Sequence, residues 1–152
     1  MGDDFSDMRK QSKRSEYLTG AIIGLGIGVL LFHRVIFGAE LTPEDVDLVA
    51  KTVQAEAGNQ DFMGKRLVAA VILNRIDNTT FPDTAEDVLS QQGQFSTYKA
   101  LPHTEATYLD RLAVNMEIKE RSDAEIVFLR AGKYGCGKPA YKYGDHYFST
   151  MK

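Results

Sequence analysis

The 152-residue chain has one cysteine, Cys136, no tryptophan and four prolines. A single cysteine excludes an internal disulfide framework and any zinc site built from several cysteines. The chain also lacks a cationic excess, since its formal net charge is −3, and we expect no nucleic-acid partner. Hydrophobic residues make up 43% and charged residues 26%, which is typical of a globular protein and excludes a disordered chain. No pair of metal ligands has a recognisable spacing, so we expect neither metal nor cofactor.

Long hydrophobic runs are also scarce, and the one present covers residues 17–38, interrupted only by His33 and Arg34. As a helix these residues would rise about 33 Å, enough for a hydrocarbon core of about 30 Å. We therefore predict a single-pass transmembrane anchor at 17–38. The four Lys/Arg residues before it predict a cytoplasmic segment at 1–16 and a domain outside the cytoplasm at 40–152.

Two other interpretations of this run stay open. A cleaved signal peptide fits the basic start but lacks a small-x-small cleavage site. A buried core helix is disfavoured by four glycines within nine residues. Gly20, Gly24 and Gly28 repeat every four residues, and this spacing predicts a face for a homodimer in the membrane. The segment also loosely resembles the releasable anchors of signal-arrest-release phage lysins.

Residues 40–152 predict an α+β, predominantly helical single domain. A helix begins after Thr42, with Pro43 in its first turn, and stops at Gly58. A second helix covers about 61–76 and a short one 85–91. A third long helix starts at Thr104, with an apolar side made of Ala106, Leu109, Ala113 and Met116. Residues 126–129 are rich in strand formers, whereas 132–152 have the composition of a loop.

Glu56 lies in an unusual place for a carboxylate. It follows Val49 by seven positions and Val53 by three, so it lies on or beside the buried face of the first helix. It is either a structural group paired with a cation or cap, or a functional acid. In the functional case, apolar surroundings would raise its pKa so that it holds a proton near neutrality, as a general acid must.

Five pieces of sequence occur in an order that resembles the SleB-like cell wall hydrolases, the catalytic domain of spore cortex-lytic enzymes and of many phage or prophage lysins. The resemblance covers about residues 43–150. No single piece is specific, but chance does not readily produce all five in order. They are Ala55–Gln60, Gly64–Arg75, Phe81–Thr84, Gln94–Ser96 and Gly144–Ser149.

This resemblance implies a lysozyme-like domain that cuts peptidoglycan glycan strands as a lytic transglycosylase. It places the catalytic glutamate at Glu56. It also implies that Gln94, Phe95 and Ser96 line the sugar groove, that Asn74 orients the catalytic region and that His146 stands near the far wall. Tyr147 is expected either to stack on a sugar ring or to anchor a loop.

One departure from the family pattern concerns a second acidic residue, in whose place this chain has Gln60. A glutamine cannot exchange a proton, so Gln60 could only position substrate or water. Asp61 and Asp145 are possible second carboxylates, but their spacing does not tie either to Glu56. Two alternatives therefore stay open: a muramidase that uses water, and a non-catalytic membrane or virion protein that binds peptidoglycan.

Overall fold

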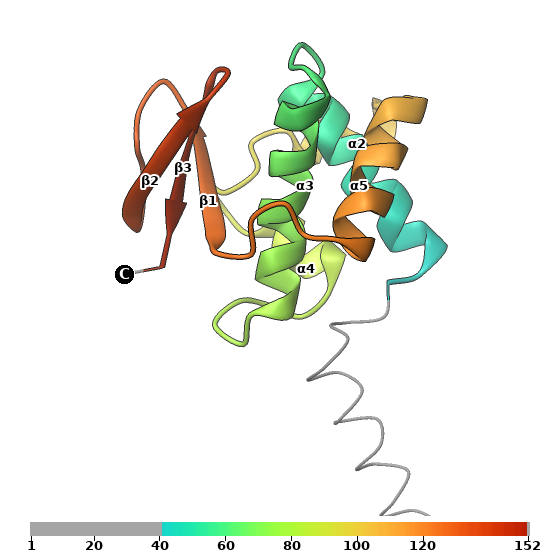
Figure 1. Ribbon diagram of the computed structural model, residues 1–152. Helices are drawn as coiled ribbons and strands as arrows, with labels where there is room; N and C mark the ends of the chain where they lie inside the picture. Colours follow the sequence, from blue (N-terminus) through green and yellow to red (C-terminus); the bar gives the residue numbers. More distant parts are fainter. Residues whose placement is uncertain (1–40, 152) are drawn as a thin grey trace, which may run out of the picture. The chain divides into compact units, whose positions relative to one another are not determined.

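Helix α3 (Phe62–Asp77) runs through the middle of the domain in the computed structural model, which describes residues 41–151 (Figure 1). Its central sequence, Leu67–Leu73, is apolar on every side, and 12 of its 16 residues are buried. A helix that is hydrophobic all round needs neighbours on all faces. Helices α2 and α5 pack on one side of it and strand β1 on another.

Helix α2 (Pro43–Ala57) begins as predicted. The Thr42 side chain accepts a hydrogen bond from the Asp45 backbone, and the Asp45 side chain accepts one from the Thr42 backbone. This reciprocal cap satisfies backbone N–H groups that the first turn leaves free. The predicted apolar face is confirmed, because the buried residues of the helix include Val49, Ala50, Val53 and Ala57.

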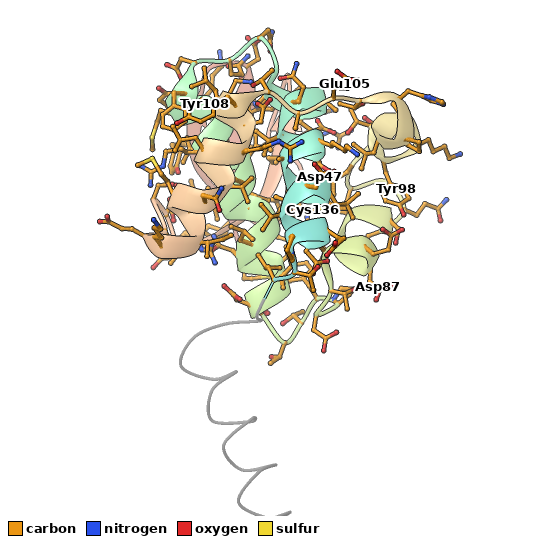
Figure 2. The ribbon with its side chains drawn as sticks, turned by 90° about the vertical axis from the view of Figure 1, so that its right-hand side faces the viewer. Asp47, Asp87, Tyr98, Glu105, Tyr108 and Cys136 are labelled. Atoms are coloured by element: carbon orange, nitrogen blue, oxygen red, sulfur yellow. The ribbon has the colours of Figure 1, made fainter. Side chains whose placement is uncertain are left out.

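Two short helices lie beside α2 on the side away from α5. They are α4 (Ala85–Ser90) and the 3₁₀ helix η1 (Tyr98–His103). The Tyr98 hydroxyl donates a hydrogen bond to Glu86 of α4, and Figure 2 shows Tyr98 and Asp87 on this same side of the domain. The polar loop between α4 and η1 is therefore held at both ends next to α2.

Helix α5 (Tyr108–Lys119) differs from its prediction. It starts at Tyr108, four residues later than expected, because the capping side chain is that of Thr107, which accepts a hydrogen bond from the Asp110 backbone. Leu109 and Met116, predicted to face inward, are 47% and 37% exposed. Two carboxylates take the buried positions: Asp110 accepts a hydrogen bond from Lys65 at 2.7 Å, and Glu117 accepts one from Arg66 at 2.6 Å. The pattern of apolar residues did not predict this buried face, because its carboxylates are paired with Lys65 and Arg66 of α3.

The chain ends in a three-stranded antiparallel sheet with the order β1-β3-β2. The strands are β1 (Ile126–Ala131), β2 (Lys138–Tyr143) and β3 (His146–Thr150). Residues 126–129, which are rich in strand formers, do lie in a strand, but the prediction of a loop over 132–152 is wrong. Strand β2 is mostly exposed and contains Pro139, so its sequence lacks a buried alternating pattern. It forms by pairing with β3 across a turn at Gly144, whose φ is +54°.

The described residues thus form a helix-rich α+β domain. No helix among residues 41–151 is both long and apolar enough to cross a membrane. The predicted anchor at 17–38, the segment 1–16 and the glycine face of Gly20, Gly24 and Gly28 lie outside the described residues and stay predictions.

Candidate active site

A cleft of about 390 Å³ opens between the C-terminal end of α2, the loop after α4 and the sheet. Phe128 and Arg130 of β1 contribute to its wall, as do Tyr147 and Ser149 of β3. Alternate residues of a strand point to one face, so these four side chains share one face of the sheet. The other lining residues are Glu56, Gly93, Gln94, Ser96, Leu129, Ala131, Gly135 and Cys136.

Glu56 reaches the cleft from the last turn of α2 and is half-buried. The Thr97 hydroxyl donates a hydrogen bond to Glu56 Oε1 at 2.7 Å. This bond leaves the other carboxylate oxygen available to a ligand in the cleft. Sequence reasoning missed Thr97, although it directly follows the Gln94–Ser96 piece.

Glu56 is the only carboxylate among the described residues that line the cleft. Asp61 is engaged elsewhere: it caps α3 by accepting from the Gly64 backbone at 2.8 Å and accepts from the Tyr143 hydroxyl at 2.9 Å. These two hydrogen bonds hold the pKa of Asp61 below its usual value, so it stays ionised. Asp145 lies in the β2–β3 turn. Neither shares the cleft with Glu56.

Gln94 and Ser96 line the cleft, as the resemblance implied, but Phe95 does not. Phe95 is 5% exposed and lies beneath the loop against the guanidinium of Arg75, 5.4 Å from its ring centroid. Because Phe95 lies between two polar residues that face the cleft, its ring points away from the cleft and anchors the loop. Phe95 therefore supports the wall rather than forming its surface.

Arg75 of α3 is a site residue that sequence reasoning treated only as a helix end. It is 2% exposed, and its guanidinium donates to Gln94 Oε1 and to the Val127 carbonyl, each at 2.6 Å. Phe81 and Phe128 pack on it together with Phe95. Burial lowers its pKa to about 10, which still leaves it charged at neutral pH. Arg75 thus connects the loop wall and the sheet wall of the cleft to the central helix.

Tyr147 forms part of the sheet wall. The Tyr134 ring meets it edge-on, with centroids 5.0 Å apart, and Lys142 Nζ lies 5.5 Å from its centroid. A half-buried aromatic ring in a polar cleft presents a face that can stack on a sugar.

Gln60 is not in the cleft. Its amide donates to Asp145 Oδ2 at 2.8 Å and accepts from the Asp145 backbone at 3.3 Å. A Cβ atom at Gly144 would collide with Gln60 Oε1, so the turn needs glycine there. An ionised glutamate could not donate to Asp145 and would repel it, which gives a physical reason for the departure from the family pattern.

Asn74 also lies away from the cleft. Its side-chain amide donates to the carbonyls of Asp123 and Ile126, at 2.8 and 2.7 Å, and so connects α3 to the start of β1. It borders a larger hollow of about 540 Å³ in which Asp77 pairs with Arg121. Glu125 also lines this hollow, but Glu56, Gln94 and Ser96 share the other cleft, and we favour that cleft as the candidate site.

His146 begins β3 and is 5% exposed, with its ring against Phe148. Its Nδ1 atom is buried without a hydrogen-bond partner among the described residues. Burial lowers the pKa of His146, while the charges of Glu56 and Asp145 act in the opposite direction. The ring is therefore neutral at pH 7 and lies near Glu56, behind the cleft surface.

The chain is similar to known proteins over most of this domain. A family model described as Cell Wall Hydrolase matches residues 59–149, which include the sheet and most of the cleft but begin after Glu56. The spore cortex-lytic enzyme of Halalkalibacterium halodurans is 38% identical over 58 residues, which are 38% of this chain and 18% of that protein. That of Oceanobacillus iheyensis is 40% identical over 52 residues, 34% and 19% of the two chains. The matched segments thus span about a fifth of these relatives' length.

Two solved structures share the fold. The catalytic domain of the Bacillus cereus SleB protein superposes with a TM-score of 0.64 at 23% identity, covering 73% of this chain and 93% of that one. The catalytic domain of the germination-specific lytic transglycosylase SleB from Bacillus anthracis gives 0.63 at 21% identity, covering 72% and 97%.

Proposed function

This chain belongs to the cell wall hydrolase family, and we propose that it cleaves peptidoglycan glycan strands as a lytic transglycosylase, with Glu56 as acid and base. The bond cut is the β-1,4 linkage between N-acetylmuramic acid and N-acetylglucosamine. The observation that carries the proposal is a cleft lined by one carboxylate, Glu56, opposite an aromatic wall.

One carboxylate suits this reaction better than hydrolysis. Ordinary glycosidases use two, about 5–5.5 Å apart for retention or about 6.5–9.5 Å for inversion. In a transglycosylase the substrate supplies its own nucleophile. Because Asp61 and Asp145 are committed to a helix cap and a turn, this cleft offers no second carboxylate among its described lining residues.

The proposed reaction has two halves. Protonated Glu56 first donates its proton to the glycosidic oxygen as the bond from that oxygen to muramyl C1 breaks. The resulting carboxylate then takes the proton of the muramyl C6 hydroxyl, whose oxygen bonds to C1 and closes a 1,6-anhydro ring. Glu56 ends protonated again and no water is consumed.

Thr97 and Gln94 would position the reacting groups. Thr97 holds one oxygen of Glu56, which restricts the carboxylate to one orientation. Gln94 is held through Oε1 by Arg75, so its amide N–H groups remain to donate to a sugar hydroxyl or acetamido oxygen.

The products of digestion test the proposal. We expect the full chain to release muropeptides with 1,6-anhydromuramic ends from purified peptidoglycan, read by mass spectrometry. Reducing muramic ends would assign the reaction to water and a muramidase. Binding without any cleavage on several wall types would favour the non-catalytic alternative.

Alkylation of Cys136 tests whether the glycan occupies this cleft. Cys136, which is labelled in Figure 2, has an exposed thiol that lines the cleft and lies within electrostatic reach of Arg75. We expect N-ethylmaleimide to inhibit cleavage, because its adduct fills space opposite Glu56. The Cys136→Ala variant should be active and insensitive to the reagent. Full activity after complete alkylation, verified by intact mass, would place the glycan elsewhere.

A further inference from the structure

A row of three side chains crosses the sheet beside the cleft. Arg130 of β1 is the register partner of Tyr147 of β3, and Tyr147 is also the partner of Lys142 of β2. Directly opposed residues of antiparallel strands point to the same face. Arg130 and Tyr147 line the cleft, and Lys142 Nζ lies over the Tyr147 ring. The row therefore places one cation on each side of an aromatic ring, as a continuation of the candidate active site.

The surrounding charge makes this row distinctive. Residues 126–144 contain four cations, Arg130, Lys133, Lys138 and Lys142, and no carboxylate. The remainder of residues 40–152 contains nine Lys/Arg and 17 Asp/Glu. An anionic polymer is repelled by most of this domain and attracted to the sheet. Arg130 and Lys142 are exposed, so their charges are accessible.

Arg130 passes close to Gly135 at the edge of the cleft. A Cβ atom built on Gly135 would lie 3.2 Å from Arg130 Cδ and 3.8 Å from Nη1, so the side chain passes close over this glycine. Both residues line the cleft. A larger residue at 135 would displace the arginine stem. The loop between β1 and β2 thus leaves room for the guanidinium at the cleft edge.

We propose that Arg130 and Lys142 bind carboxylates of the substrate while Tyr147 stacks on a sugar ring, so that this chain selects glycan strands whose muramic acids carry stem peptides with ionised carboxylates. This rests on the proposed function and adds the substrate class. The stem peptide is joined by an amide bond to the lactyl group of the same sugar that is cut, so its carboxylates are tethered to a glycan bound at Glu56. The Arg130 guanidinium and the Lys142 ammonium, one on each side of the ring, can each donate hydrogen bonds to such a carboxylate.

The test compares charged and neutralised substrate. Soluble glycan strands with peptide stems are used either as purified or after carbodiimide coupling converts their carboxylates to primary amides. For the full-length wild type, we expect neutralisation to raise KM by up to about 25-fold, since each of the two exposed ion pairs contributes up to about fivefold. The kcat should change little, because the cations bind ground state and transition state alike.

Variants assign the effect to the row. The double variant Arg130→Gln/Lys142→Gln should show the raised KM on charged strands and no further change on neutralised ones. The matched control Lys51→Gln/Lys119→Gln removes two charges from α2 and α5 and should behave as wild type. The proposal would be overturned if the wild type had equal KM values on both substrates. It would also be overturned if the double variant kept the full wild-type difference in KM between charged and neutralised strands.

A binding measurement separates this proposal from the proposed function. Cosedimentation of the Glu56→Gln variant with insoluble peptidoglycan needs no turnover, so it reports carboxylate recognition even if cleavage is absent. We expect amidation of the wall or loss of the two cations to reduce the bound fraction, and added salt to weaken binding to the charged wall. Equal binding to charged and amidated walls would overturn carboxylate recognition while leaving Glu56 catalysis to the product test.

Discussion

The Glu56→Gln variant is expected to cleave glycan strands about 10²–10⁴-fold more slowly than the wild type. Glutamine preserves the size of the side chain and can still accept a hydrogen bond from Thr97 through its oxygen. It cannot donate a proton to the glycosidic oxygen or take one from the C6 hydroxyl. The measurement is the initial rate of release of anhydro-muropeptides, with thermal unfolding to verify that the variant is folded.

Glu105→Gln is the matched control for this prediction. Glu105 lies in the exposed link between η1 and α5 and is absent from the cleft lining, so the same chemical change there should leave the rate unaltered. If folded Glu56→Gln kept more than about a hundredth of wild-type activity, Glu56 would not be the acid–base group. Asp61 and Asp145 would then be the next residues to replace.

The Arg75→Ala variant is expected to lose about 3–5 kcal/mol of unfolding free energy. The substitution leaves the Val127 carbonyl and Gln94 Oε1 without a donor and opens a cavity among three phenylalanine rings. Removing a buried charge also removes its desolvation cost, which offsets part of the loss. Even so, a loss of this size is a large fraction of the stability of a small domain.

Chemical denaturation measures this loss, with Arg111→Ala as the control. Arg111 is 44% exposed and pairs with Asp47 on the surface, so its removal should cost less than about 1 kcal/mol. Arg75→Lys should fall between the two, because an ammonium keeps the charge but cannot bridge the loop and β1 as the planar guanidinium does. A loss below about 1 kcal/mol for Arg75→Ala would contradict the connecting role assigned to this residue.

Local patterns predicted the parts of the fold that depend on neighbours in sequence. The first helix, its capping residue Thr42 and its buried face follow from side chains within one or two turns of each other. The second helix and the short α4 also occur where predicted. The strand pairing of β2 and β3 was not predictable in this way, since their residues are stabilised by one another rather than by a buried periodic face.

The same distinction, between features set by neighbours in sequence and features set by distant residues, applies to the candidate site. Glu56 stands out in the sequence because a carboxylate beside an apolar helix face is unusual, and the ordered motif pieces indicate the same residue. Gln94 and Ser96 do line the cleft, whereas Gln60 and Asn74 instead fasten a turn and the start of β1. Both residues fasten segments at least 49 positions away along the chain, which no local pattern could indicate.

Helices α2, α3 and α4, the family and the residue proposed to transfer protons could all be read from the sequence. Those properties depend on periodicity, caps and motif order, all of which act over short stretches of chain. Which polar groups share the cleft depends on the folded arrangement, because hydrogen bonds and strand register join residues far apart in sequence. That arrangement alone aligned Arg130, Tyr147 and Lys142 in one row and placed the guanidinium of Arg75 between the two walls of the cleft.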